Sequence, residues 1–207
     1  MIVSGPSLRN TPSGWPRISA LLASGKTPGD LGFSEKITPG DLNRAVSRYR
    51  LCRSFNRVLL DSYSKDTEAG YSALFKLFLT WSAFECFLSC VGLTRENCEP
   101  ILRNHKPIKL AGKIRDIDKE QVFWLFVQSR LHSPKQKQEL ENAYYGKTDN
   151  ITILASSIRH IFAHGPLTPN ANGTSPEAVI NICSILCQFL VDVVDAEFKS
   201  RVSRLAR

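Results

Sequence analysis

The stretch 67–92, TEAGYSALFKLFLTWSAFECFLSCVG, is the most apolar long segment of the chain. Its apolar side chains recur every three or four residues, which is the period of an α-helix that buries one broad face. Gly92 follows the last of them, and glycine is common just after a helix C-terminus because it tolerates a left-handed backbone. The stretch therefore predicts a long core helix.

Helical spacing recurs on both sides of this segment, whereas no part of the sequence alternates in the manner of a β-strand. Residues 41–65 predict a helix that Asp41 would cap. Shorter helices are expected within 96–105, 106–117, 118–131, 133–146 and 149–164. A long final helix should start near Ser175-Pro176, a good N-cap and first-turn pair. The sequence thus predicts an all-α bundle over residues 39–207.

Residues 1–38 differ in composition from the rest of the chain. They are rich in Gly, Pro and Ser and basic in charge, so we expect an irregular arm with at most a short helix over 17–24. Residues 1–60 carry a net charge of +6 out of the total of +8. A basic region of this kind is typical of nucleic-acid binding, and equally of solvated arginines on an exposed helix.

Composition also bears on the compartment and on membranes. The sequence predicts no bilayer-spanning run and no secretory signal in its first residues, so no membrane partner is expected. Two cysteine pairs, Cys86/Cys90 and Cys183/Cys187, have the i,i+4 spacing of small core residues on one helical face. Since no CxxC zinc motif or secreted disulfide framework is present, a reducing, cytoplasmic location is expected.

The stretch 156–166, SSIRHIFAHGP, holds the main candidate site. Arg159 and His164 are five positions apart, which separates them by about 140° on an unbroken helix. Gly165-Pro166 ends the helix, and we expect this break to let the two side chains converge on one phosphate. Arginine supplies paired hydrogen-bond donors, and histidine exchanges a proton near neutral pH.

Glu85 falls near the middle of the apolar arc of the long core helix. An ionised carboxylate in that position is costly unless it is paired, hydrogen-bonded or able to reach solvent. Two interpretations stay open: a residue at the edge of the bundle, or a carboxylate that supports the site with a basic partner.

The segment Arg159-His160-Ile161-Phe162-Ala163-His164 resembles the R-x4-6-H motif of the HEPN superfamily, and WSAFECFL (81–88) is similar to an early helix of several HEPN groups. The resemblance implies a HEPN-like bundle that forms a homodimer and acts as a metal-independent endoribonuclease. It implies that RNA is cleaved by 2′-OH attack to a 2′,3′-cyclic phosphate. Arg159 would bind the phosphate, His164 would be the acid/base, Glu85 would position them, and His160 would support them. No cofactor is implied.

The same resemblance implies a role as a toxin or defence effector, with an antitoxin or another regulatory protein as an expected partner. In HEPN toxins paired with nucleotidyltransferases, a tyrosine two positions after the histidine is the modified residue. Here that position is Pro166. Silencing by modification of that tyrosine is therefore not expected.

Two other interpretations of the motif stay open. His160 and His164 have i,i+4 spacing and would share a metal ion if Cys98, His105 or His132 supplied a third ligand. In a different class of function, the chain is a non-catalytic HEPN-like dimeric module that binds a nucleotide or a protein. We expect no metal, and we expect His105 and His132 to be ordinary surface or loop residues.

Lys106, Lys109 and Lys113 are spaced among apolar residues of the segment 106–117. If this segment lies beside the site, the lysines would bind an RNA backbone without regard to sequence. The alternative is a solvated helix face.

Overall fold

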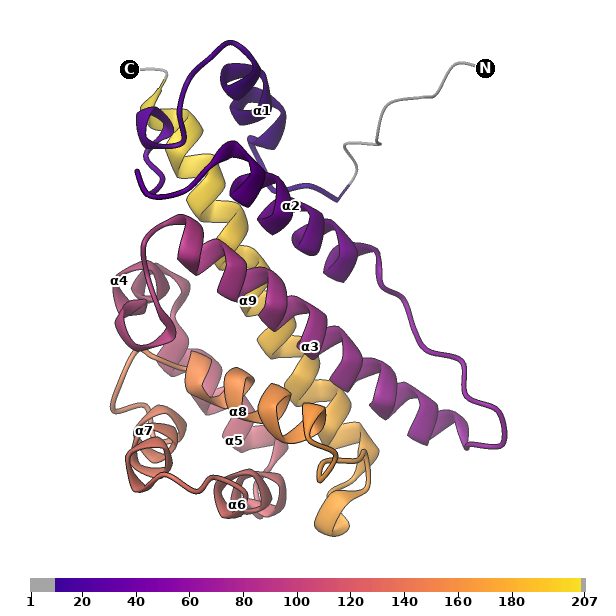
Figure 1. Ribbon diagram of the computed structural model, residues 1–207. Coiled ribbons are helices and arrows are strands. Elements are labelled where there is room, and N and C mark those ends of the chain that lie inside the picture. The colour runs from indigo at the N-terminus through magenta and orange to yellow at the C-terminus, as the bar shows by residue number, and fades with distance from the viewer. Residues whose placement is uncertain (1–9, 206–207) are drawn as a thin grey trace.

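The computed structural model describes residues 10–205, and within this range every regular element is a helix. Three helices form the long axis of the molecule: α2 (Pro39–Ser54), α3 (Lys65–Cys90) and α9 (Pro176–Arg204). Helix α3 packs against both α2 and α9, and Figure 1 shows the three running roughly along one direction. The all-α class predicted from the sequence is confirmed.

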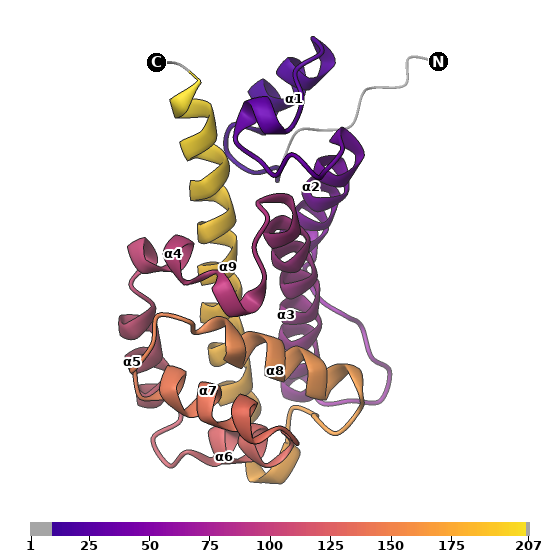
Figure 2. The same cartoon turned by 60° about the vertical axis from the view of Figure 1, so that its left-hand side comes forward.

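A group of shorter helices covers one end of this axis. It comprises α4 (Glu99–Leu102), α5 (Pro107–Ile117), α6 (Val122–Ser129), α7 (Pro134–Tyr144) and α8 (Thr152–Ala163). Helix α8 packs against α3 and α7, and α5 packs against α7 and α9 (Figure 2). Ser133 and Ser175 cap α7 and α9 as predicted, because each hydroxyl accepts a backbone N–H of the first turn.

Aromatic side chains fill the core between α3 and α9. Phe84, Phe87 and Phe198 are at most 1% exposed, and the rings of Phe87 and Phe198 lie 5.9 Å apart. Full burial of a phenylalanine side chain stabilises the folded state by about 1.5–3 kcal/mol. The long apolar segment that dominates the sequence is thus the centre of the bundle.

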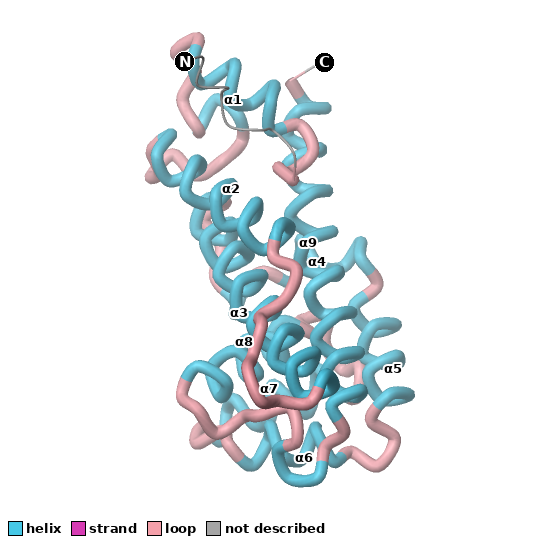
Figure 3. The backbone as a smooth tube through the Cα atoms, turned by 90° about the vertical axis from the view of Figure 1, so that its right-hand side faces the viewer, coloured by secondary structure: helices cyan, strands magenta, loops and turns pink. Residues whose placement is uncertain are grey.

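The described part of the N-terminal arm packs onto the C-terminal end of α9. Helix α1 (Trp15–Ala23) and the last turns of α9 lie at the same end of the molecule in Figure 3. Ser13 donates through its backbone N–H and its hydroxyl to the Asp195 carboxylate, at 2.6 and 2.7 Å. Arg201 donates to the Gly32 carbonyl and lies over the Phe33 ring. Residues 10–38 are therefore part of the packed bundle, and residues 1–9 lie outside the described range.

Helix α2 differs from its prediction at both ends. Its N-cap is Thr38, and Asp41 lies three residues further on, where the two side chains form a reciprocal capping box. The helix ends at Ser54, although helical spacing continues to Leu59, which is 74% exposed. In the connecting segment, the Val58 N–H donates to the Ser72 hydroxyl of α3 and not to a carbonyl one helical turn earlier.

Helices α3 and α9 differ from the expectation that no segment suits a bilayer. Both are long and apolar enough to cross a membrane by length and composition. Within the fold, 56% of the most apolar window of each helix is buried against the rest of the chain. Just over half of each window is thus contact surface within the bundle.

Three of the four cysteines whose i,i+4 spacing predicts core positions are buried. Cys90, Cys183 and Cys187 are buried, Cys86 is partly exposed, and none of the six forms a disulfide in the described range. Burial raises the pKa of Cys90 and of Cys187 to about 12. These thiols are protonated packing groups at neutral pH.

Gly70 lies where α3 meets the loop before α9, and it carries our first prediction. A Cβ there would lie 2.5 Å from the Cβ of Pro169, so Gly70→Ala should destabilise the fold by about 1–3 kcal/mol. Gly112 on α5 is the matched control, because its nearest neighbour is the flexible end of Arg115 at 3.8 Å. Gly112→Ala should stabilise by about 0.5–1 kcal/mol. Urea denaturation measures both, and equal effects of the two variants would contradict the close approach.

Candidate functional site

The C-terminal end of α8 carries the polar side chains of the motif. The helix continues through Ala163, and the His164 N–H donates to the His160 carbonyl at 3.1 Å. Gly165 follows with a left-handed φ of 89°, and its N–H donates to the Phe162 carbonyl. The predicted helix stop is confirmed, and it comes directly after His164.

Arg159 lies on the side of α8 that faces α3. Its guanidinium carbon lies 5.5 Å from the centre of the Phe78 ring, in a cation–π contact. Its Nε is buried without a hydrogen-bond partner, whereas the side chain as a whole is 34% exposed. The outer nitrogens therefore remain available to an anion.

Glu85 approaches Arg159 from α3. The distance from its Oε2 to the Arg159 Nη2 is 3.9 Å, which is an ion pair without a hydrogen bond. The Glu85 side chain is 57% exposed, so it lies at the edge of the bundle and not in the apolar core. Both sequence interpretations thus hold in part, since the carboxylate reaches solvent and also faces a basic partner. An exposed pair of this kind contributes about 0–1 kcal/mol.

A cavity of about 400 Å³ opens beside this pair. Arg159, His160 and Ser156 of α8 line one side of it, and Glu85 of α3 lines another. Arg95 also faces the cavity, but its guanidinium is occupied by Glu96 and Glu139 at 2.8 and 3.0 Å. Arg159 is therefore the cation of this cavity that is least engaged by carboxylates.

His160 and His164 lie next to each other on α8, and His164 is turned away from Arg159. Their ring centres are 4.4 Å apart, which follows from their i,i+4 positions. The pKa of His160 is lowered from its ordinary value of 6.5, first by partial burial and then by the charges of His164, Arg159 and His132. The His160 imidazole is consequently neutral at pH 7 and able to accept a proton.

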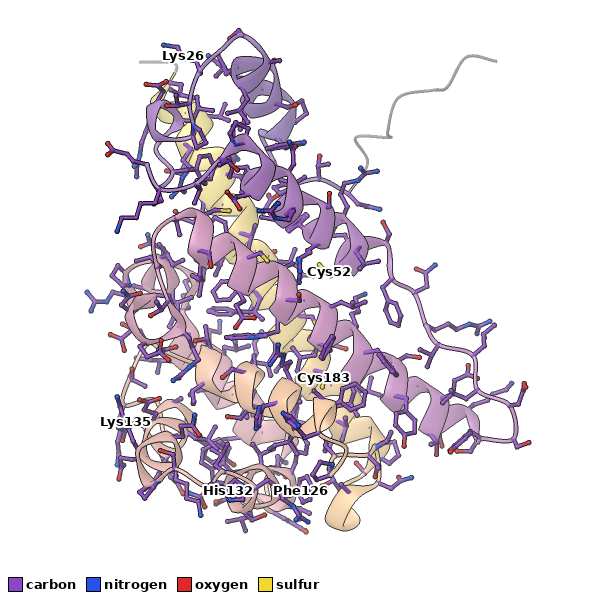
Figure 4. All side chains as sticks on the ribbon, in the orientation of Figure 1. Lys26, Cys52, Phe126, His132, Lys135 and Cys183 are labelled. Carbon is purple, nitrogen blue, oxygen red and sulfur yellow. The ribbon has the colours of Figure 1, made fainter. Side chains whose placement is uncertain are left out.

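A second cavity, of about 350 Å³, opens on the histidine side. His160 and His164 line it together with Arg130 and His132 from the connection between α6 and α7. The Arg130 guanidinium lies over the ring of Phe126, 5.1 Å from its centre. Figure 4 labels Phe126 and His132 at this end of the molecule.

His132 and Arg130 are site residues that the sequence analysis missed. We expected His132 to be an ordinary surface residue, and it is exposed, but it faces the same cavity as the motif histidines. It precedes the Ser133 cap of α7 and has no periodic relation to α8. The packing of α7 against α8 brings it to the motif, so no local pattern signalled it.

Arg159 and His164 were expected to converge within one chain, but in the structure they do not. Arg159 lines the first cavity and His164 the second, and His160 is the motif residue that borders both. The hydrogen bond from His164 to His160 keeps His164 in helical register, so the angle of about 140° between Arg159 and His164 persists. The Gly-Pro break comes one residue too late to bring them together.

Lys106, Lys109 and Lys113 also differ from their expected place. They lie on α5 and line a groove against α9 that shares no lining residue with either cavity beside α8. They are thus separate from the cavities that Arg159 and His164 line.

The described part of the chain does not provide the ligands that a metal site at His160 and His164 would need. Among residues 10–205, no three His, Cys, Asp or Glu side chains are placed to hold a metal ion. Cys98, one of the expected third ligands, is buried beside Thr152 at the start of α8, away from the histidine pair.

Comparisons of the chain with protein-family models, with curated proteins and with solved structures found no match. The functional assignment therefore depends on the side chains at the end of α8.

Proposed function

We propose that this chain is a metal-independent endoribonuclease whose catalytic groups lie at the C-terminal end of α8. The observation that carries the proposal is the pair of imidazoles, His160 and His164, with ring centres 4.4 Å apart in a cavity that also has an arginine. The resemblance of the Arg159–His164 segment to the HEPN motif supports the same chemistry. RNA is the substrate because its own 2′-hydroxyl serves as nucleophile.

The two histidines divide the proton transfers between them. Neutral His160 accepts the proton of the 2′-OH as that oxygen attacks the adjacent phosphorus. His164 is the general acid and donates a proton to the departing 5′-oxygen. The P–O5′ bond breaks as the P–O2′ bond forms, which leaves a 2′,3′-cyclic phosphate on one fragment and a 5′-hydroxyl on the other. The proximity of the two rings favours this division, since the neighbouring His164 is one of the groups that lower the pKa of His160.

Two arginines stabilise the phosphorane charge: Arg130 of the chain that carries the histidine pair, and Arg159 of a second copy. Arg130 shares a cavity with both histidines, and Arg159 faces the adjoining cavity, of which His160 forms part of the wall. Guanidinium groups bind phosphate oxygens through two donors and remain charged at any physiological pH. Glu85 positions Arg159 from α3.

A homodimer is part of this proposal, because Arg159 and His164 of one chain face different cavities. A second copy packed beside α8 would complete a site from two motifs. Exposed apolar side chains on α3 and the segment before it offer a surface for that contact: Leu59 is 74% exposed, Tyr63 57% and Phe75 40%. Light scattering on the purified chain measures the dimer directly.

The regulatory part of the proposal follows from the activity itself. A free ribonuclease is harmful to its host, so a toxin or defence role with a restraining protein partner fits the chemistry. A cytoplasmic location fits the substrate and the free thiols of the described residues.

The test uses the purified chain, a labelled single-stranded RNA and excess EDTA. We expect fragments with 2′,3′-cyclic phosphate ends, and no cleavage of the same sequence carrying 2′-deoxy or 2′-O-methyl sugars. Cleavage that requires an added divalent ion, or that acts equally on 2′-deoxy substrate, would refute the proposed chemistry.

The pH profile of cleavage is our second prediction. Since the pKa of His160 is lowered from its ordinary value of 6.5, the base becomes protonated only below that pH, and the acidic limb of the kcat/KM profile should lie below pH 6.5. His132→Ala removes one of the positive neighbours that lower this pKa, so the acidic limb should move to higher pH. An acidic limb that moves to lower pH in His132→Ala would contradict the assignment of His160 as the base.

The alternative function is a non-catalytic module that binds a nucleotide or a protein. The separation of Arg159 from His164 favours it, because a single chain does not bring both to one phosphate. A dimeric, folded protein that binds non-cleavable RNA or a nucleotide through Arg159, but leaves every RNA intact, would support this alternative.

A further inference from the structure

The groove between α5 and α9 is a second, separate site in this molecule. Its volume is about 330 Å³, within the range of small-molecule sites. In Figure 2, α5 lies to the left of the start of α9, whereas the C-terminal end of α8 lies to the right. The groove is thus independent of the proposed ribonuclease site.

One wall of the groove is positively charged. Lys109 and Lys113 are four positions apart on α5, so their side chains share one helix face, and Lys106 at the N-cap of α5 lines the same groove. Lys106 caps the helix with a left-handed φ of 57°, a conformation that lysine rarely adopts. Within the described residues, none of the three ammonium groups forms an ion pair. The wall therefore has unneutralised charge that an anionic ligand would compensate.

The floor of the groove is apolar. Leu110 of α5 and Ile185 and Phe189 of α9 line it. The ring of His105 stands at its edge, 6.2 Å from the Phe189 ring and nearly perpendicular to it. An apolar floor beside an imidazole accepts a planar heterocycle. Inorganic phosphate alone would make no apolar contact with this surface.

Polar groups lie opposite the lysines. Gln188 and Asp192 of α9 also line the groove, and the Gln188 amide donates to the Asp192 carboxylate at 2.7 Å. The amide retains a carbonyl oxygen, and the carboxylate retains a second oxygen, so both can accept hydrogen bonds from ring N–H groups or ribose hydroxyls.

From this combination we infer that the groove binds a nucleoside polyphosphate. The phosphates contact Lys106, Lys109 and Lys113, and the base lies on the apolar floor beside His105. A mononucleotide fits these features better than an RNA strand, because the groove shares no wall with the cavities of α8 where the strand would be cleaved. The inference holds whether or not the chain cleaves RNA.

Isothermal titration of the full chain with ATP, GTP, CTP and UTP tests this inference. At least one nucleotide should bind with a stoichiometry of one per chain. Lys109→Glu and Lys113→Glu should each weaken binding by about tenfold or more, since each removes a charged contact. Lys199→Glu is the matched control: this lysine is exposed on α9 and lines none of the cavities, so its variant should bind as the parent does.

Two further ligands distinguish the sources of affinity. Inorganic tripolyphosphate should bind more weakly than the nucleotide, and His105→Ala should weaken the nucleotide but not tripolyphosphate. Equal affinity for both ligands would reduce the groove to an anion patch and overturn the inference. A 2′-O-methyl RNA decamer that binds more tightly than any nucleotide, with the same dependence on Lys109, would assign the groove to RNA instead. Absence of nucleotide binding at millimolar concentration also overturns it.

Discussion

Replacement of His164 by glutamine is expected to reduce kcat for RNA cleavage by a factor of ~10²–10⁴, the usual contribution of a positioned acid or base. Glutamine retains hydrogen-bonding groups and a similar size but does not exchange a proton near neutral pH. His164 is exposed at the end of α8, so the loss of its ring should not disturb the core. His160→Gln should have an effect of the same order.

The two histidine variants should not act additively. If one imidazole removes the proton and the other returns it, loss of either stops the same step, and the double variant should be little worse than the worse single variant. Gln138→Ala is the control, because Gln138 is exposed on α7 and lines neither cavity beside α8. Thermal melts establish that each protein is folded. Additive losses, or losses confined to KM, would instead assign the histidines to RNA binding.

The helices could be predicted from the sequence because the signals that specify them are local. The i,i+3/i+4 recurrence of apolar residues in 67–92 marks α3, and the Ser-Pro pairs mark the starts of α7 and α9. The predicted C-terminal end of α2 was wrong because contacts with another part of the chain determine it. Residues 55–60 keep helical spacing, but Ser72 and Glu68 of α3 accept the backbone N–H groups of Val58 and Leu60, and the segment is not helical. Tertiary hydrogen bonds to α3, which the periodicity of residues 41–65 does not reveal, determine where α2 ends.

The candidate site could be predicted only in part for a similar reason. The motif residues lie on one helix, so their proximity was visible in the sequence, but their directions depended on where the helix ended. A single hydrogen bond, from the His164 N–H to the His160 carbonyl, extends the helix and pairs His164 with His160 instead of Arg159. His132 and Arg130 come from another part of the chain, and only the packing of α7 against α8 places them.

Arg159→Ala should lower kcat by a factor of ~10²–10³, the cost of removing one preorganised donor to a developing oxyanion. This expectation separates Arg159 from its neighbour Glu85. The Glu85–Arg159 pair is long and more than half exposed on the Glu85 side, so Glu85→Gln should change the free energy of unfolding by less than about 1 kcal/mol. Its effect on kcat should be several-fold at most, because the Phe78 ring still orients the guanidinium.

Arg103→Ala provides the matched control for Arg159→Ala. Arg103 is also an arginine in a single ion pair, 3.2 Å from Asp149, but it is more exposed than Arg159 and lines none of the cavities described above. If the loss of charge alone lowered cleavage, both arginine variants would lose activity together.

Arg159 and His164 face different cavities in one chain, so a mixture of Arg159→Ala and His164→Gln proteins is the decisive measurement. Activity recovered in the mixture shows that two chains share one site, and equal inactivity of mixture and variants assigns the whole reaction to a single chain.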